Sequence, residues 1–195
     1  MKYPALLLVA ATMLAWHAPA MSLEEPEYQV IESFEDFEIR RYSPYLVAEV
    51  DVEGDTNQAG NSAFRILAGY IFGDNRSDEK MKMTAPVASV QSDEGMTTYS
   101  FVMERKYSME SLPKPIDERI RIREVPERVM AVHSYSGRWT ESNYEKHLKV
   151  LQSAVEGAGM AAVGEPVLAR YNSPFSLPVL RRNEIMVELT GRDFE

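Results

Sequence analysis

An internal repeat is the sequence feature that most constrains the fold of this chain. At an offset of 83 residues, residues 37–54 align with residues 120–137 without a gap. With Gly54 set over Gly137, three further identities support the alignment: Ile39 with Ile122, Arg40 with Arg123, and Ala48 with Ala131. Because such self-similarity marks one supersecondary unit that is used twice, we expect two halves with the same order of elements.

Each copy begins with two predicted strands. Apolar and polar residues alternate after residue 37 and again after residue 120, which is typical of half-buried strands. A turn leads to a second strand at residues 46–52 and 129–135. In the first of these strands, Glu49, Asp51 and Glu53 are predicted to mark the side that faces solvent.

Each copy then enters a predicted helix. In the first copy, apolar residues recur at helical spacing, namely Phe64, Leu67, Ala68 and Ile71. Gly73 follows as the predicted C-terminal stop. In the second copy, Ser142 and Glu145 match the S-x-x-E capping box, and Gly157 is predicted to end the helix.

Two more strands are predicted to complete each copy, and one extra strand to precede the first. They are residues 81–90 and 97–103, then 167–171 and 184–189, with the extra strand at 28–31. The predicted fold is therefore α+β, with pseudo-symmetric ββαββ repeats at about residues 28–107 and 116–190. Single helices between runs of strands favour an antiparallel sheet, and closing it into a barrel would remove exposed edges.

The N-terminus resembles a secretory signal. Lys2 supplies positive charge, residues 5–16 form an apolar run, and residues 18–20 read Ala-Pro-Ala, an A-x-A cleavage site. The run of 12 residues is too short to span a bilayer. We expect residues 1–20 to be a signal peptide, residues 21–195 to be one domain, and the mature chain to have no stable membrane span. A disordered N-terminus or an uncleaved anchor is the alternative.

Composition excludes several kinds of chemistry. The chain of 195 residues has a net charge of −9, so a broad basic face for nucleic acid is not expected. It contains no Cys, which excludes thiol catalysis and thiolate metal ligands. No G-x-S-x-G, H-E-x-x-H or phosphate-cradling motif is present. Glu184 beside Arg182 could act as a buried acid or base, but we favour a structural ion pair. The sequence predicts a protein that is not an enzyme.

Several short runs, spread over about residues 26–190, resemble one family. They are Phe37-Glu38-Ile39-Arg40-Arg41-Tyr42, Tyr70-Ile71-Phe72-Gly73-Asp74-Asn75, Lys82-Met83-Thr84-Ala85-Pro86-Val87, Leu112-Pro113-Lys114-Pro115, Ala169-Arg170-Tyr171-Asn172 and Arg181-Arg182-Asn183-Glu184. In these runs the chain resembles the SOUL heme-binding protein family. The resemblance implies a distorted antiparallel β-barrel of two pseudo-symmetric halves and the binding of heme or a related tetrapyrrole. The same double unit resembles ligand-binding domains of some bacterial transcription regulators, so the fold alone names no ligand.

The predicted site is a groove between the first helix and a methionine-bearing strand. Met81 and Met83 alternate with Lys80 and Lys82, so the methionines would face the helix. A heme site needs an apolar cleft, cations for the propionates and sometimes an axial ligand. The predicted cofactor-binding residues are Phe64, Arg65, Ala68, Phe72, Met81, Met83, Tyr171 and His133, with Lys80, Lys82, Arg181 and Arg182 as further cations. For each apolar residue, simple core packing is the alternative.

The resemblance also implies which segments would contact heme. In heme-binding members of the family, the proposed surface includes the helix equivalent to residues 61–72 and a loop equivalent to residues 171–178. Basic and methionine side chains on that helix correspond by position to Asn61, Ala68 and Gly69 here. The chain therefore lacks those groups at those points, which motivates a second hypothesis of a different ligand.

The metal ligand is left open by the sequence. His17 leaves with the predicted signal, so His133 and His147 remain. His133 lies in the inward register of its strand, where an axial ligand and a hydrogen-bonded core histidine are both compatible with the pattern. We interpret His147 as a residue at the boundary of the second helix's apolar stripe. Met or Tyr could also coordinate iron.

Taken together, the sequence predicts an exported protein, periplasmic or secreted, that holds heme or another tetrapyrrole as a non-catalytic carrier or buffer. The alternative is a binding module for another amphipathic small molecule or a protein partner, without iron chemistry. An enzyme that acts on a bound tetrapyrrole or lipid-like substrate is a third hypothesis. Ligand identity, affinity and oligomeric state are not determined by the residues.

Overall fold

Short alternating segments of this chain form strands around one sheet, and two amphipathic segments form the helices that cover it. The computed structural model describes residues 23–53, 56–92 and 95–190, and the predicted signal peptide at residues 1–20 lies outside them. The described strands are β1 Tyr28–Ser33, β2 Glu38–Tyr42, β3 Tyr45–Glu53, β4 Val87–Gln91, β5 Met96–Val102, β6 Arg121–Val125, β7 Arg128–Tyr135, β8 Ala161–Arg170 and β9 Asn183–Thr190. The helices are α1 Thr56–Ile71, α2 Glu141–Gly157 and the short 3₁₀ turn η1 Pro178–Leu180.

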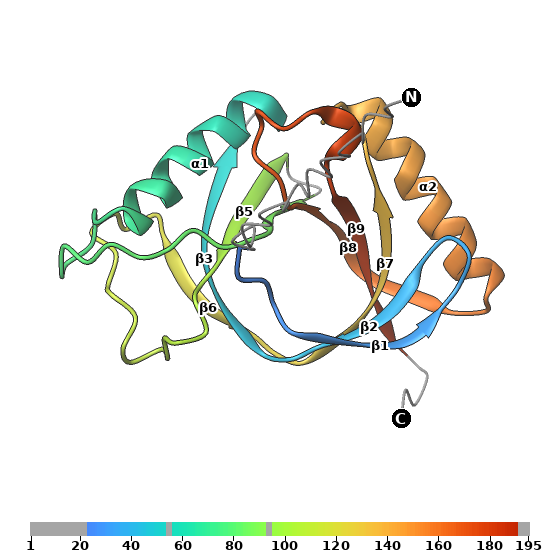
Figure 1. Cartoon of the computed structure of the whole chain (residues 1–195), viewed down its shortest axis with the longest axis horizontal. Coiled ribbons are helices and arrows are strands. Elements are labelled where there is room, and N and C mark those ends of the chain that lie inside the picture. The colour runs from blue at the N-terminus through green and yellow to red at the C-terminus, as the bar shows by residue number, and fades with distance from the viewer. Residues whose placement is uncertain (1–22, 54–55, 93–94, 191–195) are drawn as a thin grey trace, which may run out of the picture.

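The strands form one antiparallel sheet in the order β1-β2-β7-β9-β8-β4-β5-β3-β6. The sheet curls around an axis close to the viewing direction of Figure 1, and α1 and α2 lie on its outer side at opposite flanks. Within the described residues no ladder joins β1 to β6. The predicted α+β fold with a distorted antiparallel barrel is confirmed. The barrel is open, so β1 and β6 remain as edge strands of the sheet.

The strand order has a symmetry that bears on the predicted repeat. Four strands of the first half, β2 to β5, correspond to β6 to β9 of the second half. When each strand is exchanged for its counterpart, the same sheet order is obtained, read from the opposite edge, apart from the extra strand β1. The centre of this arrangement is the ladder between β4 and β8. Duplication of the sequence itself stays a prediction, because similar topology can arise in halves of different sequence.

Helix α1 packs its apolar stripe on β3 and β5. Leu67 and Ile71 are buried there against Val50 and Phe101. The predicted stop is confirmed, since Gly73 adopts a φ of +120° that favours glycine. The backbone N–H of Asp74 donates to the carbonyl of Gly69 at 2.9 Å, which satisfies a carbonyl of the last turn.

Helix α2 covers β7, β8 and β9; its predicted end at Gly157 is confirmed, and its predicted N-terminal cap is wrong by two residues. Leu151 and Val155 are buried in its contact face. The N-cap is Thr140 rather than Ser142, because the Thr140 hydroxyl reaches the N–H of Asn143 at 3.3 Å. The helix extends through Gly157, and the positive φ of +72° falls on Gly159.

The segment that carries the methionines is not a strand at its start, so the prediction of a strand over residues 81–90 is wrong for residues 81–86. Strand β4 begins at Val87. Before it, the N–H of Lys82 donates to a carboxylate oxygen of Glu104 at 2.9 Å, and the N–H of Met81 donates to Ile71 O at 2.8 Å. Pro86 has no N–H to donate. These partners are outside any ladder, which is why the alternating pattern did not produce a strand.

The inner side of the curled sheet carries charged residues, and the prediction that Glu49 faces solvent is wrong. Glu49 is 6% exposed and accepts hydrogen bonds from Arg123 at 3.1 Å and from Arg121 at 3.3 Å. Asp51 also accepts from Arg121, which holds the pKa of its carboxyl below the usual value. The polar face of β3 therefore turns toward paired arginines of β6 across the ladder.

A second charged network surrounds Glu184, which is 1% exposed. Its carboxylate accepts from Arg40 Nη1 at 3.1 Å, from Tyr171 OH at 2.7 Å and from Ser134 Oγ at 3.1 Å. Arg182 Nε lies farther away, at 3.6 Å. The structural ion pair favoured from the sequence is present, with Arg40 as the nearer partner.

Asn75 fixes the loop that leads from α1 toward the methionine segment. The side chain is 1% exposed; its Nδ2 donates to Tyr70 O and Glu79 O, and its Oδ1 accepts from the N–H groups of Ser77 and Glu79. Asn75→Asp replaces both donated bonds by repulsion between a carboxylate and two carbonyls. We expect a loss of about 2–3 kcal/mol in unfolding free energy, measured by urea denaturation.

The matched control in the same loop is Asp78→Asn, which exchanges the same two groups in the reverse direction at an exposed position. Its effect should stay within about 0.5 kcal/mol. Equal stability of Asn75→Asp and wild type would show that the four hydrogen bonds do not hold the loop.

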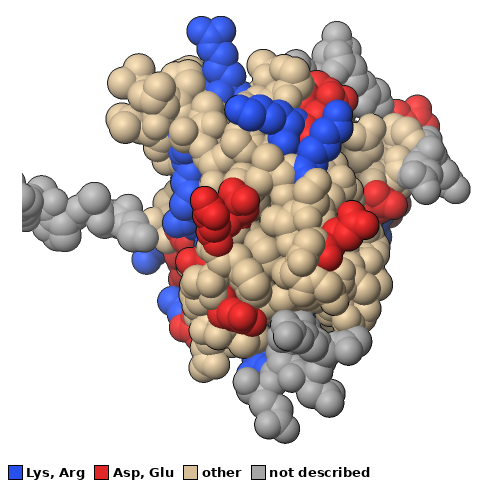
Figure 2. Space-filling model, turned by 90° about the vertical axis from the view of Figure 1, so that its right-hand side faces the viewer, with Lys and Arg blue, Asp and Glu red and all other residues tan. Residues whose placement is uncertain are grey.

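The outer face over α2 shows how charge is distributed. In Figure 2, acidic side chains are spread over the centre of this face and basic side chains project mostly from its upper part. No described helix is both long and apolar enough to cross a bilayer.

Candidate ligand-binding site

The candidate site lies along the ladder between β4 and β8, on the outer side of the sheet. Val87 pairs with Arg170, and Ser89 pairs with Leu168. Alternate residues of a strand share a face, and the intervening Ala88 and Val90 pack in the inner cluster. The residues at Val87, Ser89 and Gln91 therefore face outward, into the strip that α1 and α2 leave uncovered.

One end of this strip holds an apolar cavity of about 420 Å³. It lies between α1, the segment before β4 and the loop after β8. The residues that line it are Leu23, Gly60, Asn61, Phe64, Met83, Thr84, Ala85, Val87, Tyr99, Trp139, Arg170, Tyr171, Asn172, Ser173 and Pro174. Phe64 is 45% exposed, and its ring packs edge-on against Phe101 with 5.4 Å between centroids. The helix thus presents an aromatic side chain to an open apolar hollow.

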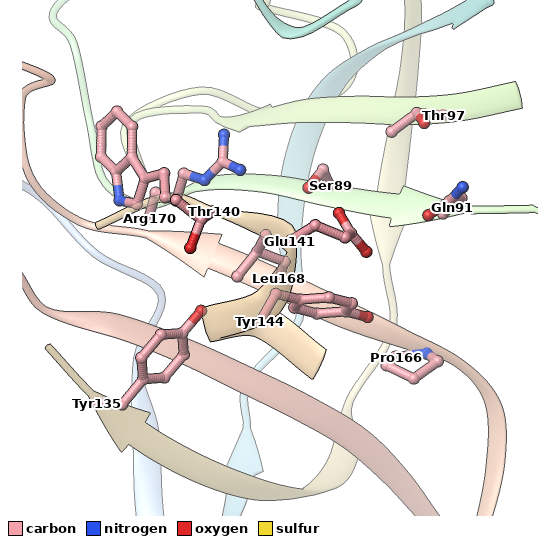
Figure 3. A pocket seen from close by; sticks show the side chains of 11 residues that line it. Ser89, Gln91, Thr97, Tyr135, Thr140, Glu141, Tyr144, Pro166, Leu168 and Arg170 are labelled. Carbon is pink, nitrogen blue, oxygen red and sulfur yellow. The ribbon is translucent and has the colours of Figure 1, made fainter. Parts of the chain in front are cut away.

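The other end holds a smaller polar cavity of about 90 Å³ beside the start of α2. Ser89, Gln91 and Thr97 come from β4 and β5, and Thr140 and Glu141 come from the start of α2. Figure 3 shows the Tyr135 and Tyr144 rings and the Glu141 carboxylate around this hollow, with Arg170 at one side. A cavity of this size holds water molecules or one small polar group.

Trp139 and Arg170 line both cavities. The guanidinium carbon of Arg170 lies 5.0 Å from the centroid of the Trp139 ring, and that of Arg181 lies 4.4 Å from it. Arg170 Nε is buried without a hydrogen-bond partner. Burial lowers the pKa of Arg170, although its guanidinium stays protonated at neutral pH. The junction of the two cavities therefore holds a cation over an aromatic face.

The loop that closes the apolar cavity is held by its own backbone acceptors. Arg181 donates from Nε to Ser176 O at 3.0 Å and from Nη2 to Pro174 O at 2.7 Å. Trp139 Nε1 donates to Asn183 Oδ1 at 2.7 Å, and Asn183 is 0% exposed. These bonds position the indole ring and the loop without involving Arg170.

The sequence model of the SOUL heme-binding protein family matches residues 23–188, which is most of the chain. The chain belongs to the SOUL heme-binding protein family. The family predicted from the sequence motifs is confirmed. Two curated relatives are similar to this SOUL protein over most of its length. Heme-binding protein 2 of Homo sapiens is 29% identical over 181 residues, which cover 86% of this chain and 87% of the relative. Heme-binding protein 2 of Mus musculus is 29% identical over 177 residues, which cover 84% of this chain and 85% of the relative.

Solved structures share the architecture of this SOUL protein at low identity. The C-terminal domain of EcmrR superposes with a TM-score of 0.62 at 10% identity, covering 84% of this chain and 98% of that domain. An uncharacterized conserved protein from Listeria innocua gives a TM-score of 0.57 at 12% identity, covering 87% and 94%. At these identities the likeness shows the fold alone.

The structure brings together three of the predicted site residues of this SOUL protein, which are Phe64, Met83 and Tyr171 in the apolar cavity. Ala68 and Met81 are 8% and 5% exposed and pack in the core under α1. Phe72 lies after the end of α1 and is 57% exposed, outside the cavity lining. Arg65 lines a different hollow beside Asp117 and Arg119. The predicted helix groove is therefore present, but narrower along α1 than expected.

His133 lies away from the apolar cavity, beneath α2. Its Nδ1 donates to the carbonyl oxygen of Asp36, and its Nε2 lies 2.9 Å from Nδ1 of His147. The His147 ring stacks on Tyr135 with 4.2 Å between centroids. Burial and the neighbouring His133 lower the pKa of His147, which favours its neutral form. The contacts match the hydrogen-bonded core histidine among the two predicted roles.

The apolar cavity has the volume of a small-molecule pocket, and its lining offers few groups that could coordinate iron. Its volume of about 420 Å³ lies within the range of small-molecule pockets, roughly 300–1,000 Å³. The Tyr171 hydroxyl donates to Glu184, and burial together with the Glu184 charge raises the pKa of Tyr171, which disfavours a phenolate ligand. Met83 is the lining residue whose sulfur could coordinate iron. Among the described residues, no group of three His, Cys, Asp or Glu is arranged to hold a metal ion.

Sequence reasoning missed Trp139 and Arg170. Arg170 lay within a run that carried the family resemblance, and its alternation with Ala169 gave it the outward register. Trp139 precedes a helix and had no periodic signal. Trp139 meets the loop after β8 only in the folded chain, where both line the apolar cavity.

Proposed function

We propose that this protein binds heme or a related tetrapyrrole in the apolar cavity and acts as a non-catalytic carrier or buffer. The observation that carries this proposal is the open cavity walled by Phe64, Met83 and Trp139 in a chain of the SOUL heme-binding protein family. The two relatives named heme-binding protein 2 support a tetrapyrrole as the ligand. Flat apolar walls suit a planar macrocycle.

The non-catalytic part of the proposal is supported by the state of the acidic candidate. Glu184 accepts from three donors and is buried on the inner side of the sheet. Three donors occupy most of the roughly four acceptor sites of this buried carboxylate, so a substrate proton has little access to it. Export to the periplasm or the medium is also part of the proposal, and the signal-like residues 1–20 support it.

A second candidate function is supported by Asn61, which lines the cavity at a position where the family resemblance implies a basic side chain. With an amide in place of a cation, an uncharged amphipathic molecule would bind in the same cavity without iron chemistry. Native mass spectrometry of protein taken from its own host distinguishes the two ligands by mass.

Hemin titration tests the proposed function. Wild-type protein should give a saturable shift of the Soret band, and Phe64→Asp should weaken binding at least about tenfold, because it removes an aromatic wall and adds a charge. Circular dichroism and thermal unfolding confirm that the variant is folded.

Phe72→Asp is the matched control for this titration. It makes the same change in the same segment, at a side chain that is exposed and outside the cavity lining. Its affinity should stay within about twofold of wild type. No saturable shift in wild type, or equal losses in both variants, would contradict the proposed site.

A further inference from the structure

Arg170 is half-buried and forms no ion pair, although the negative charge of Glu141 favours its guanidinium. Arg40 bonds Glu184, and Arg121 and Arg123 bond Glu49. In the described part of the chain, no carboxylate forms an ion pair with Arg170, and its Nε has no hydrogen-bond partner. Removing part of a charge from water is costly when no hydrogen-bonded anion compensates it, so the position of Arg170 calls for an explanation.

The position of Arg170 points to a ligand rather than to the fold. The side chain lies at the junction of the apolar and polar cavities and contributes to the lining of both. One face of its guanidinium is near the Trp139 ring. In Figure 3 it borders the hollow that Ser89 and Thr140 line from opposite elements. An arginine held in this way presents its N–H groups to whatever occupies the junction.

A carboxylate is the group that this arrangement recognises best. A guanidinium offers a planar fork of donors that matches the two oxygens of a carboxylate. The polar cavity of about 90 Å³ has room for one such group, whereas the apolar cavity of about 420 Å³ accepts a larger flat body. The two cavities together therefore match an amphipathic acid with its acidic group directed toward α2.

We propose that Arg170 is the anion-binding group of the site and pairs a carboxylate of a flat amphipathic ligand at the junction of the two cavities. This inference rests on the proposed function and defines how its ligand is oriented. Trp139 stacks on the guanidinium and keeps it in place. Glu141, which lines the polar cavity, opposes a second anionic group there.

The test compares hemin with hemin dimethyl ester, which has the same ring and no free carboxylate. Trp139 is the one tryptophan besides Trp16, so in a Trp16→Phe background its fluorescence quenching reports ligand at the site. Arg170→Gln should weaken hemin about 30-fold, the usual effect of one charge-assisted hydrogen-bonded pair, and leave the ester within about twofold. Arg170→Lys should bind hemin with intermediate affinity, and Glu141→Gln should bind it more tightly than wild type.

Arg128→Gln is the matched control, because Arg128 also has a buried Nε without a partner but lines neither cavity. Its affinity for hemin should equal that of wild type. The melting temperature of Arg170→Gln should not fall, since the change removes a half-buried charge that forms no ion pair. Equal losses for hemin and ester, or no loss for hemin, would overturn the inference while leaving the proposed function intact.

If wild type does not bind hemin, the proposed function fails and a second probe decides the role of Arg170. The probe is 8-anilinonaphthalene-1-sulfonate, a flat apolar anion whose emission rises in an apolar cavity. If the wild-type protein enhances the emission and Arg170→Gln binds the probe about tenfold more weakly, the anion site is supported. Enhancement that is absent, or equal in both proteins, would overturn it.

Discussion

Glu184→Ala is expected to lower the unfolding free energy by about 3–5 kcal/mol, the range for breaking a buried ion pair from one side. The change leaves Arg40, which is 5% exposed, without its buried partner, and removes the acceptor of the Tyr171 and Ser134 hydroxyls. Although burial opposes the charge, the Glu184 carboxylate holds the pKa of Arg40 above its usual value. For a domain of this size the melting temperature should fall by about 10 °C. Differential scanning calorimetry measures the change.

Two comparisons make the Glu184 prediction specific. Asp117→Ala breaks the exposed pair with Arg119 and should cost no more than about 1 kcal/mol. The double variant Arg40→Met with Glu184→Leu should recover much of the lost stability, because both charges are removed together. A loss below about 1 kcal/mol for Glu184→Ala would mean that Arg40 is stabilised mainly by Glu38, at 2.8 Å.

Trp139→Ala is expected to have the largest effect on ligand binding. The indole lines both cavities and stacks on Arg170 and Arg181. Losing half or more of the contact area of a tryptophan corresponds to about 2–3 kcal/mol, or roughly 30- to 150-fold in Kd for hemin. The Soret titration measures this loss, because the variant has no tryptophan at the site for fluorescence.

Trp139→Phe separates the ring from the N–H group. The phenyl ring keeps a stacking surface, so hemin affinity should fall by about fivefold or less. The buried Asn183 Oδ1 loses its donor, and stability should drop by about 1–2 kcal/mol. If Trp139→Ala binds hemin as wild type does while Phe64→Asp does not, the ligand occupies the α1 end of the apolar cavity alone.

Local patterns of the chain predicted most of the elements. Period-two alternation identified β2, β3, β6 and β7, and period 3.6 identified both helices, because side-chain direction in each element is a local property. The wrong start of the predicted methionine strand has a cause in tertiary contacts. The strand predicted from Met81 depended on alternation alone, whereas its N–H groups bond Ile71 and Glu104, which are distant in the chain or in another element.

Part of the site could also be predicted. Phe64 and Met83 belong to segments whose apolar character is visible in the chain, and both line the apolar cavity. The first helix predicts Arg65 and Phe72 at the same groove, but helical rotation places Arg65 at another hollow, and Phe72 lies after the helix end. His133, a predicted axial ligand because imidazole commonly binds iron, contacts His147, 14 residues away, outside the apolar cavity.

The sequence by itself determined the family, the α+β class and the succession of most strands and helices along the chain, because these follow from local periodicity and from motifs spread along the chain. The tertiary structure alone decided that Glu49 and Glu184 are buried with arginines, and that Trp139 and Arg170 meet between two cavities. Burial and pairing depend on which strands become neighbours in the curled sheet. That neighbourhood is set by long-range packing, which no local pattern encodes.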